Sequence, residues 1–149
     1  MRAAVQRVSR AAVNVAGRVV GQIGPGLLVY AAAAPDDGPD DTAYVAEKLA
    51  HLRIFPDAAG KMNLDVGQAA GAVLLVSAFT LLADARKGRR PSFDGSASGE
   101  AAEPLIAQLA DGLRGFGLTV ETGRFGAYMQ VESVNDGPIC ILLDSRRAV

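Results

Sequence analysis

The residues best suited to chemistry are Ser77 and Thr80, two hydroxyl side chains that follow the apolar run Val73–Val76. A short apolar run of this kind predicts a buried strand. The two hydroxyls therefore lie where a core strand reaches solvent. A polar cluster at the end of a rigid strand is held accurately, and its backbone N–H groups stay free for a ligand. The residue types alone also allow a plainer interpretation, in which Ser77 and Thr80 only end the strand.

A basic cluster follows this stretch, with four cations in five residues: Arg86, Lys87, Arg89 and Arg90. An exposed run of charge needs no function to explain it. Next to a candidate site, however, the same cluster predicts contact with phosphates, because arginine and lysine neutralise phosphate charge. Its position directly after the two hydroxyls favours the phosphate interpretation.

The second unusual stretch is Gly137–Pro138, near the end of the chain. A Gly-Pro peptide bond adopts the cis form at modest cost. In that form it exposes two nearly parallel carbonyls with no side chain over one of them. Such carbonyls could bind an amino group and exclude a side chain. The residues alone favour an ordinary trans turn, so both forms stay open at this point.

Several common mechanisms are excluded by the residues present. No Cys/His cluster suits zinc, and neither a G-x-S-x-G elbow nor a Walker-type phosphate loop occurs. The single histidine, His51, has no partners for a catalytic triad, and Cys140 lies in an apolar strand without an activating neighbour. An enzyme built from this chain must use backbone N–H groups, hydroxyls and the groups of its substrate. We expect no cofactor and no metal.

The composition predicts one domain spanning residues 1–149, with half of the residues hydrophobic. The net charge of −1 provides no overall basic field, so nucleic acid must be bound by a local patch. One cysteine excludes an internal disulfide and fits a reducing compartment. No signal peptide is recognisable, and no apolar run approaches the roughly 20 residues that span a bilayer. The expected location is cytoplasmic, away from membranes.

The periodicity predicts an alternation of short strands with two helices. One helix follows the acidic loop 35–41 and carries the apolar stripe Val45, Leu49 and Leu52. The other spans Glu100–Phe116. A sharp turn is expected at Asn135–Pro138. The predicted strands are 3–8, 11–15, 19–23, 27–34, 61–64, 72–76, 118–121, 128–134 and 139–143.

Eight separated stretches resemble the D-aminoacyl-tRNA deacylases, in that family's order and spacing. They are Gln6–Val8, Gly24–Leu28, Arg53–Phe55, Lys61–Asn63, Ser77–Leu81, Gly88–Phe93, Thr122–Gly126 and Asn135–Pro138. The resemblance covers nearly the whole chain. It implies a compact α/β fold, with mixed and antiparallel sheets in a barrel-like layered arrangement and two main helices on one side.

The resemblance also implies a function and a homodimer. The reaction is hydrolysis of the ester that joins a D-amino acid or glycine to the 3′-terminal adenosine of tRNA. Backbone N–H groups of Phe79 and Thr80 face the substrate carbonyl in such proteins. The pair Gly137 and Pro138 is cis, reaches into the partner's pocket and rejects L-amino acids, and Arg7 helps to hold it.

The resemblance extends these roles to further residues. Ser77 joins Thr80 and the Phe79 backbone as a catalytic residue. The resemblance also assigns Ala78, Phe125, Gly126 and Met129 to the substrate pocket. The predicted contacts to tRNA are Arg86, Lys87, Arg89 and Arg90.

Two positions depart from the family pattern, and they keep alternatives open. Ala78 replaces a glutamine beside the pocket, and Cys140 replaces a threonine after Gly-Pro. One alternative is a catalytically impaired paralogue that still binds aminoacyl-tRNA ends. Another is a deacylase with relaxed chirality and a trans Gly137–Pro138 bond. For catalysis we favour help from the ribose 2′-hydroxyl over attack by Thr80, because no base near Thr80 is visible.

Overall fold

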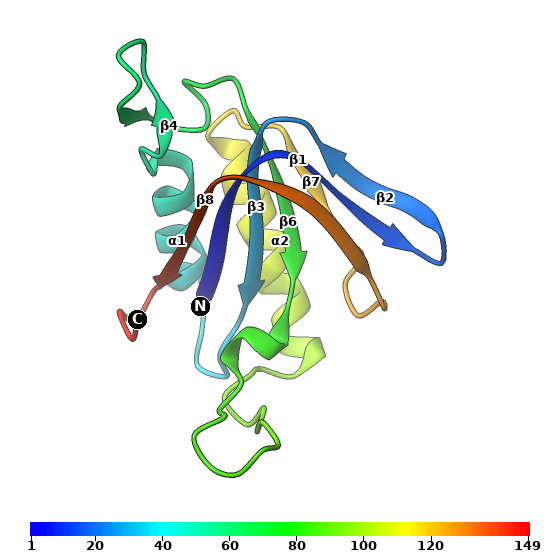
Figure 1. Cartoon of the computed structure of the whole chain (residues 1–149). Coiled ribbons are helices and arrows are strands. Elements are labelled where there is room, and N and C mark those ends of the chain that lie inside the picture. Colours follow the sequence, from blue (N-terminus) through cyan, green and yellow to red (C-terminus); the bar gives the residue numbers. More distant parts are fainter.

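The computed structural model describes the whole chain, residues 1–149, and its centre is a six-stranded mixed sheet (Figure 1). The strand order is β2-β1-β3-β6-β7, and β8 pairs with β1. Strands β3, β6 and β7 are parallel, whereas β1 is antiparallel to β2, β3 and β8. The strands are β1 (Arg2–Val15), β2 (Arg18–Ile23), β3 (Gly26–Ala32), β6 (Ala72–Ser77), β7 (Val120–Thr122) and β8 (Gln130–Asp144). A separate hairpin joins β4 (Phe55–Pro56) to β5 (Met62–Leu64).

The sheet curls until its two ends meet. A side chain on Gly21 of β2 would place its Cβ 2.4 Å from the carbonyl oxygen of Thr122 on β7. Only glycine allows the two strands to approach so closely. The expected barrel-like α/β arrangement is therefore confirmed, as a sheet that is nearly closed.

Both helices cover one face of the sheet (Figure 1). They are α1 (Pro39–His51) and α2 (Gly99–Gly115), close to the predicted ranges. Leu105, Leu109 and Leu113 recur along one side of α2 and are buried, which is the spacing of a helix face that packs on a core. They belong to a cluster of 24 buried residues between the helices and the sheet. Neither helix is long and apolar enough to cross a membrane.

Strand β1 is continuous, although the sequence predicted two strands separated at Ser9 and Arg10. The interruption does not form because β8 runs beside nearly all of β1, from Arg2 to Asn14. On its other side β1 pairs first with β3 and then with β2. Long-range pairing of this kind overrides a local break in the apolar pattern.

Strand β8 is likewise continuous, and the predicted turn at Asn135–Pro138 is a bulge within it. Gln6 pairs with Cys140 and Val8 pairs with Asn135. One residue of β1, Arg7, therefore faces four residues of β8, from Asp136 to Ile139. The extra residues have no partner on β1 and interrupt the ladder, as in the special β-bulges that insert more than one residue.

Candidate active site

The predicted hydroxyl stretch lies at the end of β6 and continues into a short 3₁₀ helix, η1 (Phe79–Leu82). The N–H of Ala78 still binds the carbonyl of Ala31 on β3, at 2.9 Å. The first bond of the helix runs from the Leu81 N–H to the Ala78 carbonyl, at 3.0 Å. The N–H groups of Phe79 and Thr80 come before that bond, and the helix gives them no partner. Both N–H groups are therefore free to donate to a ligand.

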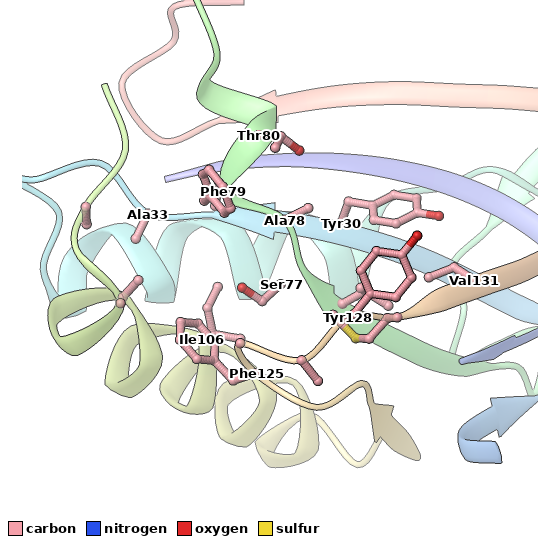
Figure 2. A pocket seen from close by; sticks show the side chains of 18 residues that line it. Tyr30, Ala33, Ser77, Ala78, Phe79, Thr80, Ile106, Phe125, Tyr128 and Val131 are labelled. Carbon is pink, nitrogen blue, oxygen red and sulfur yellow. The ribbon is translucent and has the colours of Figure 1, made fainter. Parts of the chain in front are cut away.

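These donors border a cavity of about 690 Å³ (Figure 2). It lies between η1, the beginning of α2 and the segment Phe125–Met129. The structure thus brings together seven of the predicted site residues along its wall. They are Ser77, Ala78, Phe79, Thr80, Phe125, Gly126 and Met129.

The cavity also has walls that the sequence did not predict. Figure 2 shows Tyr30 from β3 and Ile106 from α2. It also shows Tyr128 from the loop before β8 and Val131 from the beginning of β8. Tyr30 interrupts an apolar run, and Tyr128 is 89% exposed. An aromatic side chain in each place was a signal in the sequence, but only the fold shows that both reach one cavity.

The lining contains no acid, base or thiol apart from the two tyrosines. Burial raises the pKa of the Tyr30 hydroxyl above its ordinary value of 10.0, so this group stays protonated at neutral pH. Tyr30 can donate a hydrogen bond but cannot serve as a general base. Thr80 consequently lacks a neighbour that could take its proton. The arrangement is suited to holding a carbonyl group and stabilising a developing oxyanion.

Three of the residues predicted for substrate selection lie outside this cavity: Arg7, Gly137 and Pro138. Gly137 and Pro138 are exposed on the bulge of β8, and their peptide bond is cis. Arg7 reaches the bulge from β1, and its Nε donates to the carbonyl oxygen of Asp136 at 2.9 Å. Its Nη1 donates to the carbonyl oxygen of Ile54 at 2.7 Å. Within one chain, then, Gly137 and Pro138 have no contact with the cavity that the other residues line.

The basic residues form a loop that protrudes beyond η1, at the bottom of Figure 1. Its neck is closed by a pair of backbone hydrogen bonds between Asp84 and Ser92, both 2.8 Å. Arg86 is held by Asp84 through two side-chain hydrogen bonds of 2.9 and 2.6 Å. These bonds lower the pKa of Asp84 from 3.8 to about 2. Three cations stay exposed and without an ion pair: Lys87, Arg89 and Arg90.

The two departures from the family pattern differ in their surroundings. Ala78 lines the cavity, so its short side chain leaves space that a glutamine would occupy. Cys140 is exposed on β8, and its Sγ lies 4.0 Å from Nε2 of Gln6. Ala78 is therefore the change that alters the shape and polarity of the cavity itself.

Comparisons with known proteins agree on one family. A family model described as D-Tyr-tRNA(Tyr) deacylase matches residues 4–144. A protein of Anaeromyxobacter dehalogenans named D-aminoacyl-tRNA deacylase is 62% identical over 99% of both chains. One of the same name from Symbiobacterium thermophilum is 55% identical, over 99% of this chain and 97% of its own.

Solved structures show the same fold. The c-Myc DNA Unwinding Element Binding Protein superimposes with a TM-score of 0.91 at 36% identity, covering 97% of this chain and 98% of that one. A structure described as a probable eukaryotic D-amino acid tRNA deacylase superimposes with a TM-score of 0.85 at 17% identity. It covers 96% of this chain and 98% of its own, and at this identity it supports the fold alone.

Proposed function

Because the chain belongs to the D-Tyr-tRNA(Tyr) deacylase family, it is a D-aminoacyl-tRNA deacylase, and we propose how its residues divide the work. The substrate ester joins a D-amino acid or glycine to the 3′-terminal adenosine of tRNA. The observation that supports this division is the cavity at η1, where two free backbone N–H groups meet a lining without a base. Residues 1–149 act in this proposal as one domain.

The proposed reaction depends on positioning and on stabilisation of charge. The substrate carbonyl binds the N–H groups of Phe79 and Thr80. Water adds to the carbonyl carbon, and those N–H groups stabilise the oxyanion that forms. The bond to the 3′-oxygen then breaks, and that oxygen takes up the proton lost by water. The neighbouring ribose 2′-hydroxyl assists the proton transfer, while the Ser77 and Thr80 hydroxyls orient the substrate.

Selection against L-amino acids is proposed to need a second copy of the chain. Gly137 and Pro138 are exposed and have no contact with the cavity of their own chain. They lie on β8, which pairs only with β1 and so leaves one edge open. On the same strand, Val134 is 41% exposed and Leu142 is 51% exposed. An open edge with exposed apolar side chains favours pairing with another strand. In a homodimer, Gly137 and Pro138 would enter the partner's cavity and exclude an L-side chain by contact.

The basic loop is the proposed contact to the tRNA backbone. The loop leaves the molecule directly beyond η1 (Figure 1). We propose that a tRNA end reaches the cavity from this side, where Lys87, Arg89 and Arg90 would contact its phosphates. Arg86 can contact a phosphate only after its ion pair with Asp84 breaks. A tRNA substrate also supports the proposed cytoplasmic location. Nothing favours the impaired paralogue, since relatives named as deacylases match the full chain at 50–62% identity.

The decisive experiment is hydrolysis of one tRNA charged with D-tyrosine and, separately, with L-tyrosine. We expect rapid loss of the D-ester, while the L-ester decays at the rate without enzyme. Loss of both esters would contradict the proposed selectivity. A folded dimer that cleaves neither ester but still binds the charged tRNA would instead support the impaired paralogue.

The proposed dimer is tested by Leu142→Lys, which places a charge on the exposed face of the edge strand β8. Light scattering should show a dimer for the wild type and a monomer for the variant. The monomer should also hydrolyse the L-ester faster relative to the D-ester, because no partner supplies Gly137 and Pro138. A monomeric wild type with full selectivity would contradict the cross-subunit site. The matched control is Val19→Lys, which charges an exposed apolar residue of β2.

A further inference from the structure

The bulge of β8 is closed by the side chain of Asn135, which stands at its beginning. The Asn135 Oδ1 accepts a hydrogen bond from the Ile139 N–H at 2.7 Å. The Asn135 Nδ2 donates to the Ile139 carbonyl oxygen at 3.0 Å. One side-chain amide thus binds both polar groups of a single residue at the far end of the bulge. This is the paired exchange that two opposed residues make across an antiparallel sheet.

Two side chains therefore hold opposite ends of the segment that carries Gly137 and Pro138. Arg7 binds the carbonyl of Asp136 at the first position of the bulge, at 2.9 Å, and its guanidinium lies 3.6 Å from the Asp136 carboxylate. Asn135 binds Ile139 at the last position. The two central residues are fixed from both sides, although neither is buried.

The segment has no free space on its inner side. A Cβ built on Gly137 would lie 2.7 Å from the Ile139 nitrogen and 2.7 Å from the Ile139 Cγ1. The nitrogen nearest to this added Cβ is the one that donates to Asn135. If Asn135 released Ile139, the backbone next to Gly137 would lose the two hydrogen bonds that anchor it.

From these contacts we propose that Asn135 is a positioning residue, which orients Gly137 and Pro138 so that they exclude L-aminoacyl groups. This inference rests on the proposed function of that pair. Exclusion by contact is sensitive to position, because a displacement of about 1 Å changes rates by two orders of magnitude at a reacting centre. Asn135 itself touches no substrate and acts only through the segment that it holds.

The test compares the wild type with Asn135→Ala and Asn135→Asp, using tRNA charged with D-tyrosine or L-tyrosine. Asn135→Ala removes both hydrogen bonds, and we expect the ratio of kcat/KM for the D-ester over the L-ester to fall about tenfold. Asn135→Asp keeps the acceptor for the Ile139 N–H, so its ratio of the two kcat/KM values should lie between those of the wild type and Asn135→Ala. A purely structural defect would lower the active fraction for both esters equally and leave the ratio unchanged.

Asp57→Ala is the matched control. The Asp57 side chain also closes a turn, by accepting from the N–H groups of Ala59 and Lys61 at 2.9 and 3.0 Å. It lies between β4 and β5 and has no place in the proposed site. Its loss should leave the ratio of the two esters as in the wild type.

Amide exchange at Ile139, measured by NMR, tests the contact without any need for activity. We expect a protected Ile139 N–H in the wild type and fast exchange in Asn135→Ala. An unchanged ester ratio in Asn135→Ala, or an Ile139 N–H that exchanges equally fast in both proteins, overturns the proposal. If the wild type cleaves neither ester, the proposed function is wrong, and the exchange result still decides whether Asn135 holds the segment.

Discussion

Oγ of Ser96 donates a hydrogen bond to the carbonyl oxygen of Phe79, at 2.8 Å. That carbonyl belongs to the same planar peptide group as the N–H of Thr80. Fixing the oxygen therefore fixes the direction of the N–H, which is one of the two proposed donors to the substrate. The Phe93 ring adds to this support, since it meets the Phe79 ring edge-on with centroids 5.2 Å apart. The segment that follows the basic loop thus holds the backbone of the candidate site.

Loss of this hydrogen bond should slow the reaction more than it weakens binding. We expect Ser96→Ala to lower kcat for the D-ester by about three- to tenfold, with little change in KM, because a single neutral hydrogen bond contributes about 1 kcal/mol. Steady-state kinetics measure both parameters. Thr119→Ala, which removes an exposed hydroxyl without a hydrogen bond, should behave as the wild type. A variant that raises KM alone would contradict a role in orienting the Thr80 N–H.

Two substitutions at Thr80 separate its side chain from its backbone. Thr80→Ala removes the hydroxyl together with the γ-methyl but keeps the backbone N–H, and it should lower kcat less than tenfold. Thr80→Pro removes the N–H, and we expect a loss on the order of 100-fold or more, the typical effect of deleting an oxyanion donor. Proline suits the φ angle of a 3₁₀ helix. Thermal unfolding of both variants checks that the fold is retained, and equal losses in the two would favour a nucleophilic Thr80.

The basic loop predicts a salt dependence of tRNA binding. Arg90→Ala should flatten the slope of log K against log salt by about 0.7 to 0.9, the contribution of one phosphate contact. D- and L-charged tRNA should be affected alike, because phosphates carry no information on the amino acid. Filter binding at several salt concentrations measures the slope. Arg18→Ala, an exposed arginine at the beginning of β2, is the control, and an equal effect there would mean that the loop is not the contact.

The pairing of Asp84 with Arg86 predicts a narrow range of acid sensitivity. Hydrogen bonds from Arg86 lower the pKa of Asp84 in the folded protein to about 2, from 3.8. A lowered carboxyl pKa means that the pair stabilises the loop above pH 3.8, and that this contribution is lost as the pH falls from 3.8 towards 2. NMR titration of the Asp84 carboxyl should show the low value. Arg86→Ala should return it towards 3.8, and an unchanged value would contradict the assignment of Arg86 as its partner.

Much of the candidate site could be predicted from local sequence. Val73–Val76 forms a buried strand, as its apolar run indicated, and Ser77 with Thr80 follows at its end. The helix predicted over Glu100–Phe116 agrees with α2 to within one residue at each end, because its apolar side chains recur at helical spacing and Ser98 caps it. The family could also be predicted, since its motifs are short segments with a set order. All of these depend on neighbours along the chain.

Other features were decided by tertiary contacts that no local pattern carries. Tyr30, Ile106 and Tyr128 reach one cavity only because the curled sheet and α2 bring them together. Strand pairing with β1 turned the expected turn at Asn135–Pro138 into a bulge. The amino-acid sequence by itself thus determined the elements and the family. Long-range register determined which side chains meet, because each such contact depends on partners far away in the chain.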